Sequence, residues 1–187
     1  MRVLLARPYS WISAKGNGLP LSLASLAGVL VQGGHEVRIV DLALVDYSLG
    51  KKHYFANLEE FQPQIVGLTC NSHERFFAFE LAAWTKEFRD IPIVAGGPHI
   101  TFTAGETLKF VPQLDILVTY EGEETLLDIC QALGKGSPLE GIPGIYFRSN
   151  GNIHYTAIRP FIRDLNTLPL PARHLFQVKQ YDLNLPL

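Results

Sequence analysis

The sequence predicts an α/β fold built on a doubly wound, five-stranded parallel sheet. Apolar, strand-like runs alternate with helix-like stretches along most of the chain, which is the pattern of successive βα units. The apolar runs are rich in Val, Ile and Leu, as expected of strands that are buried on both faces. Three of these runs end in small or polar residues, and the carboxyl ends of parallel strands meet at one edge where ligands bind.

The elements follow in order along the chain. Strands are predicted at residues 2–6, 36–42, 64–69, 93–95 and 115–119. Helices are predicted at residues 21–32, 56–61, 75–88, 104–110 and 123–133. Gly33 and Gly134 end the first and last of these helices, because glycine readily adopts the conformation found after a helix. Right-handed crossovers with one reversal favour the flavodoxin-like strand order 2-1-3-4-5.

The pattern changes after Gly141. Two short strand-like runs, 144–148 and 153–156, flank Asn150-Gly151, a dipeptide typical of a tight hairpin turn. Beyond Arg159, prolines exclude a regular helix; they are Pro160, Pro169, Pro171 and Pro186. We therefore predict a domain of residues 1–141, followed by a hairpin and linker in residues 142–187 that lead toward a missing domain.

Composition excludes several classes of function. The 187 residues carry 16 Lys+Arg and 18 Asp+Glu, a formal charge of −2 without a basic cluster, so nucleic acid is not an expected partner. We recognise no signal peptide or membrane-spanning run, and the expected location is the cytoplasm. The two cysteines, Cys70 and Cys130, fit no zinc or redox spacing. Cys130 is expected to be a small core residue.

The candidate site lies where strands end and helices begin. Glycines give a ligand room, and hydroxyl and amide groups supply hydrogen-bond donors and acceptors. The start of the first helix adds polar backbone groups. The predicted ligand contacts are Leu21, Ser22, Thr69, Cys70, Asn71, Ser72, Gly96, Gly97, Pro98, His99, Tyr120, Glu121, Gly122 and Glu123.

Simpler interpretations compete with this site. The Gly96-Gly97-Pro98 segment is also what a tight strand-to-helix turn requires. Glu124 is explained by the favourable position of acidic residues at a helix start, whereas Gly122 suggests the close approach of a ligand. A buried, structural Cys70 is favoured over a ligand-facing one. His73 and His99 could bind a metal, but hydrogen-bonded turn histidines are commoner.

Other chemistries do not fit. Gly16-Asn17-Gly18 offers two glycines of a dinucleotide fingerprint, but Leu21 occupies the third position and Pro20 intrudes, so we reject it. The acidic residues of a phosphoacceptor site are absent after the first strand. No nucleophile-base arrangement or carboxylate pair can be assembled at the strand ends. The chain is predicted to hold a ligand and not to transform one.

Seven segments, taken in order, carry a family resemblance. They are residues 1–8 and 19–27, Gly33-Gly34-His35-Glu36-Val37, residues 63–69, Val94-Ala95-Gly96-Gly97-Pro98-His99, Tyr120-Glu121-Gly122-Glu123-Glu124-Thr125, and residues 164–171. Together they resemble the amino-terminal cobalamin-binding domain of the B12-dependent radical SAM proteins. The resemblance covers nearly the whole chain.

This resemblance implies a Rossmann-like (flavodoxin-like) sheet that binds cobalamin. The corrin would lie over the carboxyl ends of the strands, with the nucleotide tail beside the sheet. Residues 19–23, 69–72, 96–99 and 120–124 would line the site. The partner would be a radical SAM domain of the same polypeptide, which would hold a [4Fe-4S] cluster and S-adenosylmethionine. The parent enzyme would be methyltransferase-like, and this domain would not be catalytic alone.

One motif of other B12 proteins is absent. Asp-x-His-x-x-Gly supplies a histidine ligand to cobalt, but Asp41 and Asp46 are followed by Ala43 and Ser48 at the histidine position. The alternative function is a non-catalytic, flavodoxin-like interaction domain that no longer binds cobalamin. Its docking surface would be an apolar tail made of Phe161, Leu165, Leu168, Leu170, Leu175 and Phe176.

Overall fold

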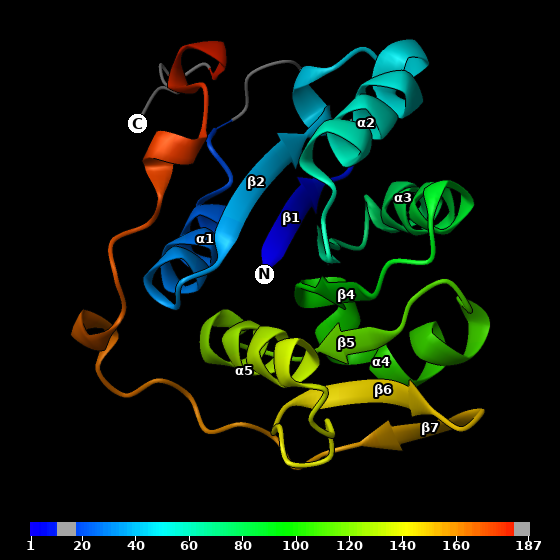
Figure 1. Cartoon of the computed structure of the whole chain (residues 1–187), viewed down its shortest axis with the longest axis vertical. Coiled ribbons are helices and arrows are strands. Elements are labelled where there is room, and N and C mark those ends of the chain that lie inside the picture. Colours follow the sequence, from blue (N-terminus) through cyan, green and yellow to red (C-terminus); the bar gives the residue numbers. More distant parts are fainter. Residues whose placement is uncertain (11–17, 182–187) are drawn as a thin grey trace.

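The computed structural model describes residues 1–10 and 18–181, and within them seven strands form one sheet. The strand order is β2-β1-β3-β4-β5-β6-β7, so the parallel part has the predicted order (Figure 1). The strands are β1 (Arg2–Arg7), β2 (Glu36–Asp41), β3 (Ile65–Thr69), β4 (Ile93–Gly96), β5 (Ile116–Val118), β6 (Ile145–Ser149) and β7 (Asn152–Tyr155). The predicted α/β class and doubly wound sheet are confirmed. Of the rejected fingerprint glycines, Gly16 lies outside the described residues.

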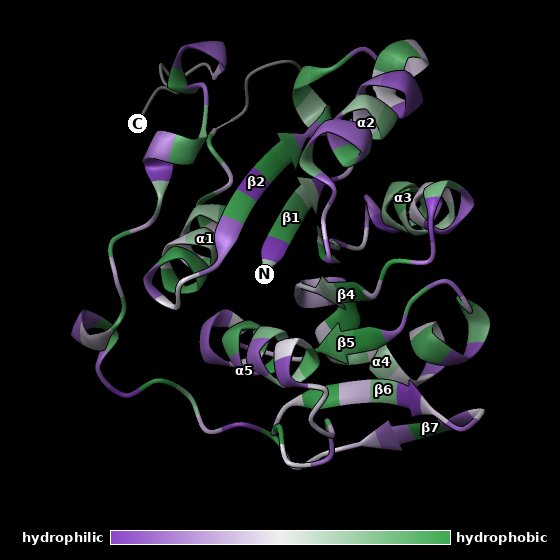
Figure 2. Ribbon diagram, in the orientation of Figure 1, coloured by the Kyte–Doolittle hydropathy of each residue, from purple (hydrophilic) through white to green (hydrophobic). Residues whose placement is uncertain are grey.

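Helices cover both faces of the parallel strands. They are α1 (Leu21–Gln32), α2 (Tyr47–Phe61), α3 (Arg75–Phe88), α4 (Pro98–Phe110) and α5 (Glu123–Lys135). The α1 and α5 helices pack on one face, and α2, α3 and α4 pack on the other, which creates two separate hydrophobic clusters. The central strands are mostly hydrophobic, whereas the outermost strand β7 is mostly hydrophilic (Figure 2). Burial on both faces explains the continuous apolar runs in the sequence.

Two helices begin well before their predicted starts. The α2 helix begins at Tyr47 and not near residue 56, because its buried positions Gly50, Tyr54 and Leu58 recur at helical spacing and start before that point. The α4 helix begins at Pro98 and not near residue 104. Proline suits the first helical position because its missing N–H has no partner there in any case. The β-branched residues that follow have a low helix propensity, so the sequence pattern does not predict this start.

The predicted hairpin is present, and it extends the sheet. Its first strand, β6, pairs antiparallel with β5, and β7 pairs antiparallel with β6. Ile145 and Phe147 of β6 enter the same hydrophobic cluster as α1 and α5. The hairpin therefore covers the edge of β5 that would otherwise present unpaired backbone groups.

The last segment, residues 156–181, is called the strap here. It runs from β7 across α5 and α1 and ends beside β2 (Figure 1). Three single-turn helices interrupt it: η2 (Leu165–Thr167), η3 (Arg173–Leu175) and η4 (Val178–Gln180). The backbone N–H of Ala172 donates to the Ala24 carbonyl of α1 at 2.8 Å, and Gly28 leaves room for the Leu170 carbonyl.

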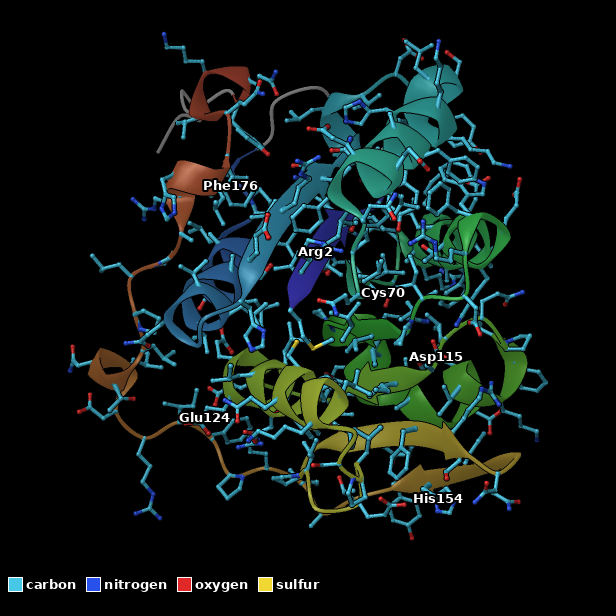
Figure 3. The ribbon with its side chains drawn as sticks, in the orientation of Figure 1. Arg2, Cys70, Asp115, Glu124, His154 and Phe176 are labelled. Carbon is cyan, nitrogen blue, oxygen red and sulfur yellow. The ribbon has the colours of Figure 1, made fainter. Side chains whose placement is uncertain are left out.

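The strap contributes to the core, which corrects one expectation. Phe176, which Figure 3 labels in the strap, is predicted from the sequence to lie in an exposed apolar tail. It is instead buried against Tyr181 and the α1 side of the sheet. Leu165 and Leu170 do remain exposed, at 66% and 89% of their surface. The division of the chain at residue 141 stays a prediction.

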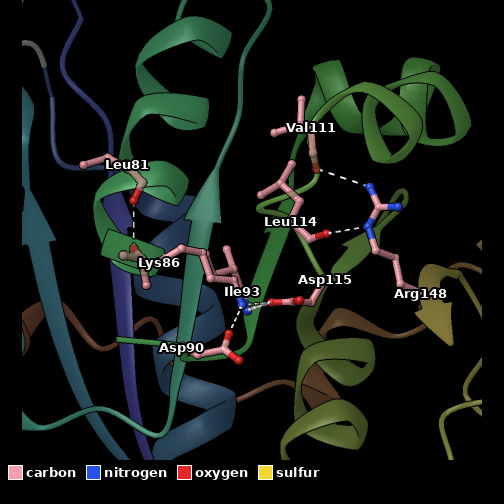
Figure 4. Close-up of polar contacts among 9 residues, drawn as sticks. Leu81, Lys86, Asp90, Ile93, Val111, Leu114, Asp115 and Arg148 are labelled. Carbon is pink, nitrogen blue, oxygen red and sulfur yellow. Dashed lines mark hydrogen bonds and ion pairs between the residues drawn. The ribbon is translucent and has the colours of Figure 1, made fainter. Parts of the chain in front are cut away.

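Polar contacts hold the amino edge of the parallel strands, opposite the carboxyl edge where the site is predicted. Lys86 pairs with Asp90 and Asp115 at 2.7 and 2.9 Å, and Asp115 accepts a hydrogen bond from the Ile93 backbone (Figure 4). The Arg148 guanidinium donates to carbonyl groups at and after the end of α4, including Leu114 and Val111. These contacts satisfy carbonyls that the end of a helix leaves unpaired. Among the described helices, none has both the length and the apolar character needed to cross a bilayer.

Candidate functional site

A cavity of about 520 Å³ opens at the carboxyl edge of the parallel strands, between α1 and α5. Its floor is the sheet, where Leu5, Val94 and Val118 come from β1, β4 and β5. Gly67 of β3 lies among them, and a Cβ added at Gly67 would stand only 2.7 Å from the Leu5 side chain. The site therefore has an apolar floor in which one strand position is kept free of a side chain.

Most of the predicted contacts line this cavity. The structure brings together Ser22 of α1, Thr69 at the end of β3, Gly96, Gly97 and Pro98 between β4 and α4, and Tyr120, Glu121, Gly122 and Glu123 between β5 and α5. Leu21, Cys70, Asn71, Ser72 and His99 are not in its lining. The turns after β3, β4 and β5 thus converge as the topology predicts.

Several lining residues escaped sequence reasoning. The additional residues are Leu5, Leu26, Gly67, Leu68, Val94, Thr101, Phe102, Val118 and Leu126, whereas Leu23 falls within the segment 19–23 that the resemblance implies. Most are apolar residues inside strands and helices, where a pattern cannot distinguish a cavity wall from ordinary core. Phe102 could have been predicted, because it is a large aromatic residue in the first turns of a helix that follows a candidate ligand-binding turn.

Backbone geometry explains Gly97 without a ligand. Gly97 has φ +114°, and an added Cβ would lie 2.8 Å from the Cys70 carbonyl oxygen. The same carbonyl accepts a hydrogen bond from the His99 N–H at 3.2 Å, which joins the β3 and β4 turns. Cys70 is fully buried, as expected, and burial raises the pKa of its thiol to about 12. Gly97 is therefore required for the approach of two turns, and Cys70 is a structural residue.

The β5–α5 turn is held by polar contacts from two sides. Ser25 of α1 donates to the Glu123 carboxylate at 2.8 Å, and the Ile162 N–H of the strap donates to Glu121 at 2.7 Å. A Cβ at Gly122 would lie 3.2 Å from Leu26, so close packing of α1 accounts for this glycine. Both acidic residues at the cavity are thus oriented by neighbouring segments.

Tyr120 stands at the rim in an unusual conformation. Its φ is +61°, and its backbone N–H donates to the Thr101 hydroxyl at 3.0 Å. The ring contacts Phe161 of the strap edge-on, with centroids 5.7 Å apart. The strap therefore contacts the β5–α5 turn at a residue that lines the cavity, although Phe161 itself is not in the lining.

The two histidines near the strand ends are engaged elsewhere. His99 Nδ1 lies 3.2 Å from the Ser72 hydroxyl, and His73 Nε2 lies 3.3 Å from the carboxylate of Glu74. Burial, and then the charge of Arg75, lower the pKa of His99. Within residues 1–10 and 18–181, no group of three or more His, Cys, Asp or Glu residues could hold a metal ion.

Comparison with known proteins gives one family and several longer relatives. The family described as "B12 binding domain" matches residues 11–129. An uncharacterized methyltransferase of Pyrococcus horikoshii is 32% identical over 97% of this chain and 40% of its own length. The anaerobic magnesium-protoporphyrin IX monomethyl ester cyclase of Rubrivivax gelatinosus is 33% identical over 90% of this chain and 32% of its own length. The chain thus spans less than half of either relative.

Solved structures share the fold. The cobalamin-dependent S-adenosylmethionine radical enzyme OxsB, with aqua-cobalamin and S-adenosylmethionine bound, superposes with a TM-score of 0.76. The match has 21% identity and covers 92% of this chain and 24% of OxsB. The radical S-adenosylmethionine methyltransferase TsrM from Kitasatospora setae, with cobalamin and a [4Fe-4S] cluster bound, gives 0.70 at 23% identity, over 83% of this chain and 30% of TsrM.

Proposed function

Because this chain belongs to the B12-binding domain family, we propose that it holds cobalamin with the corrin over the carboxyl edge of the sheet and the nucleotide tail in the cavity between α1 and α5. The observation that carries the proposal is the convergence of three strand-end turns on one apolar cavity. Its volume lies within the range of about 300–1,000 Å³ that is usual for small-molecule sites.

The lining fits such a cofactor. A flat heterocyclic base needs apolar surface around it, which Leu5 and Val94 of the floor and Leu126 of α5 supply. At the mouth, the hydroxyl groups of Ser22 and Thr69 can donate to or accept from the amide and phosphate groups of the ligand. When bound, cobalamin supplies a cobalt centre able to carry a methyl group, while the protein binds and orients it.

The parent reaction extends beyond this chain. We propose that the domain serves a longer radical SAM enzyme, whose further domain holds a [4Fe-4S] cluster and S-adenosylmethionine. OxsB and TsrM combine cobalamin with S-adenosylmethionine chemistry, and the Pyrococcus horikoshii relative is described as a methyltransferase. TsrM and the Pyrococcus horikoshii relative support methyl transfer as the parent activity, and OxsB and TsrM support the radical SAM domain as the partner.

A docking role is the alternative. Phe161, Leu165 and Leu170 of the strap expose large apolar side chains, which would favour contact with another domain. Phe176 does not support this role, because it is buried. Such a role predicts dimerisation or aggregation of the isolated chain that substitution of these three exposed residues by Ser abolishes. Sedimentation of the two proteins would decide.

Titration with hydroxocobalamin tests the proposed function. We expect the absorbance spectrum of the cofactor to change on binding to the purified chain, and Val94→Phe to weaken binding by about tenfold or more because the added ring occupies the cavity. Val31→Phe on the exposed side of α1 is the matched control and should bind normally. A folded wild-type chain that leaves the spectrum unchanged at high micromolar cofactor would contradict the proposal.

A further inference from the structure

Tyr120 carries backbone strain at the rim of the cavity. Among the described residues other than glycine, positive φ values occur at Gln62, Tyr120 and Asn150. Gln62 follows the end of α2, and Asn150 lies in the hairpin turn before Gly151, which are both common places for this conformation. A bulky aromatic residue between a strand and a helix has no such explanation. Strain of this kind persists where the surroundings impose it, and it concentrates at ligand sites.

Neighbouring groups impose this conformation on Tyr120. The Thr101 hydroxyl accepts from the Tyr120 N–H and donates to the Gly97 carbonyl at 3.2 Å. On the other side, the N–H and the hydroxyl of Thr119 both donate to the Gly144 carbonyl, at 3.0 and 3.1 Å. The turn is therefore fixed from α4 and from the start of the hairpin, and this holds Tyr120 in the lining of the cavity.

The strap places a second aromatic ring beside it. Arg159 pairs with Glu124 at 3.1 Å and with Asp128, and the Ile162 N–H binds Glu121, so the residues on both sides of Phe161 are anchored. Yet Phe161 and Tyr120 keep 62% and 47% of their surface exposed. Tyr120 lines the cavity and Phe161 packs against it, so the two anchored and partly exposed rings form a preorganised apolar contact surface. Phe161 lies beyond residues 11–129, which the family match covers.

We propose that Tyr120 and Phe161 form an aromatic lip that contacts the macrocycle of the bound cofactor. The proposal rests on cobalamin binding as the proposed function, and it adds the strap to the ligand site. The strained backbone at Tyr120 is then the cost of presenting its ring to the ligand. The contact is made by the rings, so replacing Tyr120 with Phe preserves it.

The test compares affinity with stability. Hydroxocobalamin is titrated into the wild-type chain and into Tyr120→Gly, Tyr120→Phe and Phe161→Ala, and each thermal midpoint is measured without cofactor. Glycine suits a φ of +61°, so Tyr120→Gly should melt no lower than the wild type while it binds about tenfold more weakly. Tyr120→Phe should bind within about threefold of the wild type, and Phe161→Ala should bind more weakly than Tyr120→Phe.

Matched controls separate the lip from general effects. Asn150→Gly also removes a side chain from positive φ, and Leu170→Ala removes an exposed strap residue; both should bind like the wild type. Unchanged affinity in Tyr120→Gly, or weaker binding accompanied by a lower melting temperature, would overturn the lip while leaving cobalamin binding intact. Failure of the wild-type chain to bind would overturn both proposals.

Discussion

At the scale of single residues, His35 illustrates a group whose protonation affects folding. Its Nδ1 lies 3.2 Å from the amino group of Met1, at the edge of the sheet opposite the cavity, and its buried Nε2 has no partner among the described residues. Burial, followed by the charge of the amino terminus, lowers the pKa of His35 below its usual 6.5. His35 is thus structural, as its position before β2 predicts.

This lowered pKa gives a pH dependence with a definite sign. The unfolded chain binds a proton at His35 more readily than the folded chain, so the stability present above pH 6.5 is lost as pH falls toward the folded pKa. We expect the free energy of unfolding to decrease more in the wild type than in His35→Gln between pH 7.5 and pH 5.5. Urea denaturation at both pH values measures the difference. Equal losses in the two proteins would contradict this assignment.

At the scale of elements, the strap is part of the folded structure. Phe176 packs against Tyr181, whose hydroxyl donates to the buried Asp41 carboxylate at the end of β2 at 2.9 Å. Phe176→Ala should lower the free energy of unfolding by about 3–5 kcal/mol, because it removes a buried aromatic ring and leaves a cavity. Leu165→Ala, on an exposed part of the strap, should change it by no more than about 0.5 kcal/mol. Similar losses in both variants would show that the strap does not pack as described.

At the scale of the whole molecule, the strands follow from the sequence because the buried ones are continuous apolar runs, and their order follows from right-handed crossovers with one reversal. The turns that meet at the cavity follow from that order. The pairing of β6 with β5 could not be predicted, since an edge strand and an isolated hairpin have the same residue pattern. The cavity floor could not be predicted either, because Leu5 and Val118 look like ordinary core residues.

Removal of the strap should affect the stability of the whole molecule. A chain ending at residue 155 lacks Ala172, Phe176 and Tyr181, which belong to the hydrophobic cluster between the sheet and α1. We expect this truncated chain to melt well below the full chain and to lose cobalamin binding, because α1 forms one wall of the cavity. Thermal melting and cofactor titration check both effects. Unaltered melting would mean that the strap is dispensable for folding.

The route of the strap restrains how the cavity can open. One continuous stretch of backbone is fastened to α5 through Arg159, to α1 through Ala172 and to β2 through Tyr181. Moving α1 and α5 apart would break at least one of these three contacts. The separation of α1 and α5 is therefore restrained by a segment that contributes no residue to the lining of the cavity between them.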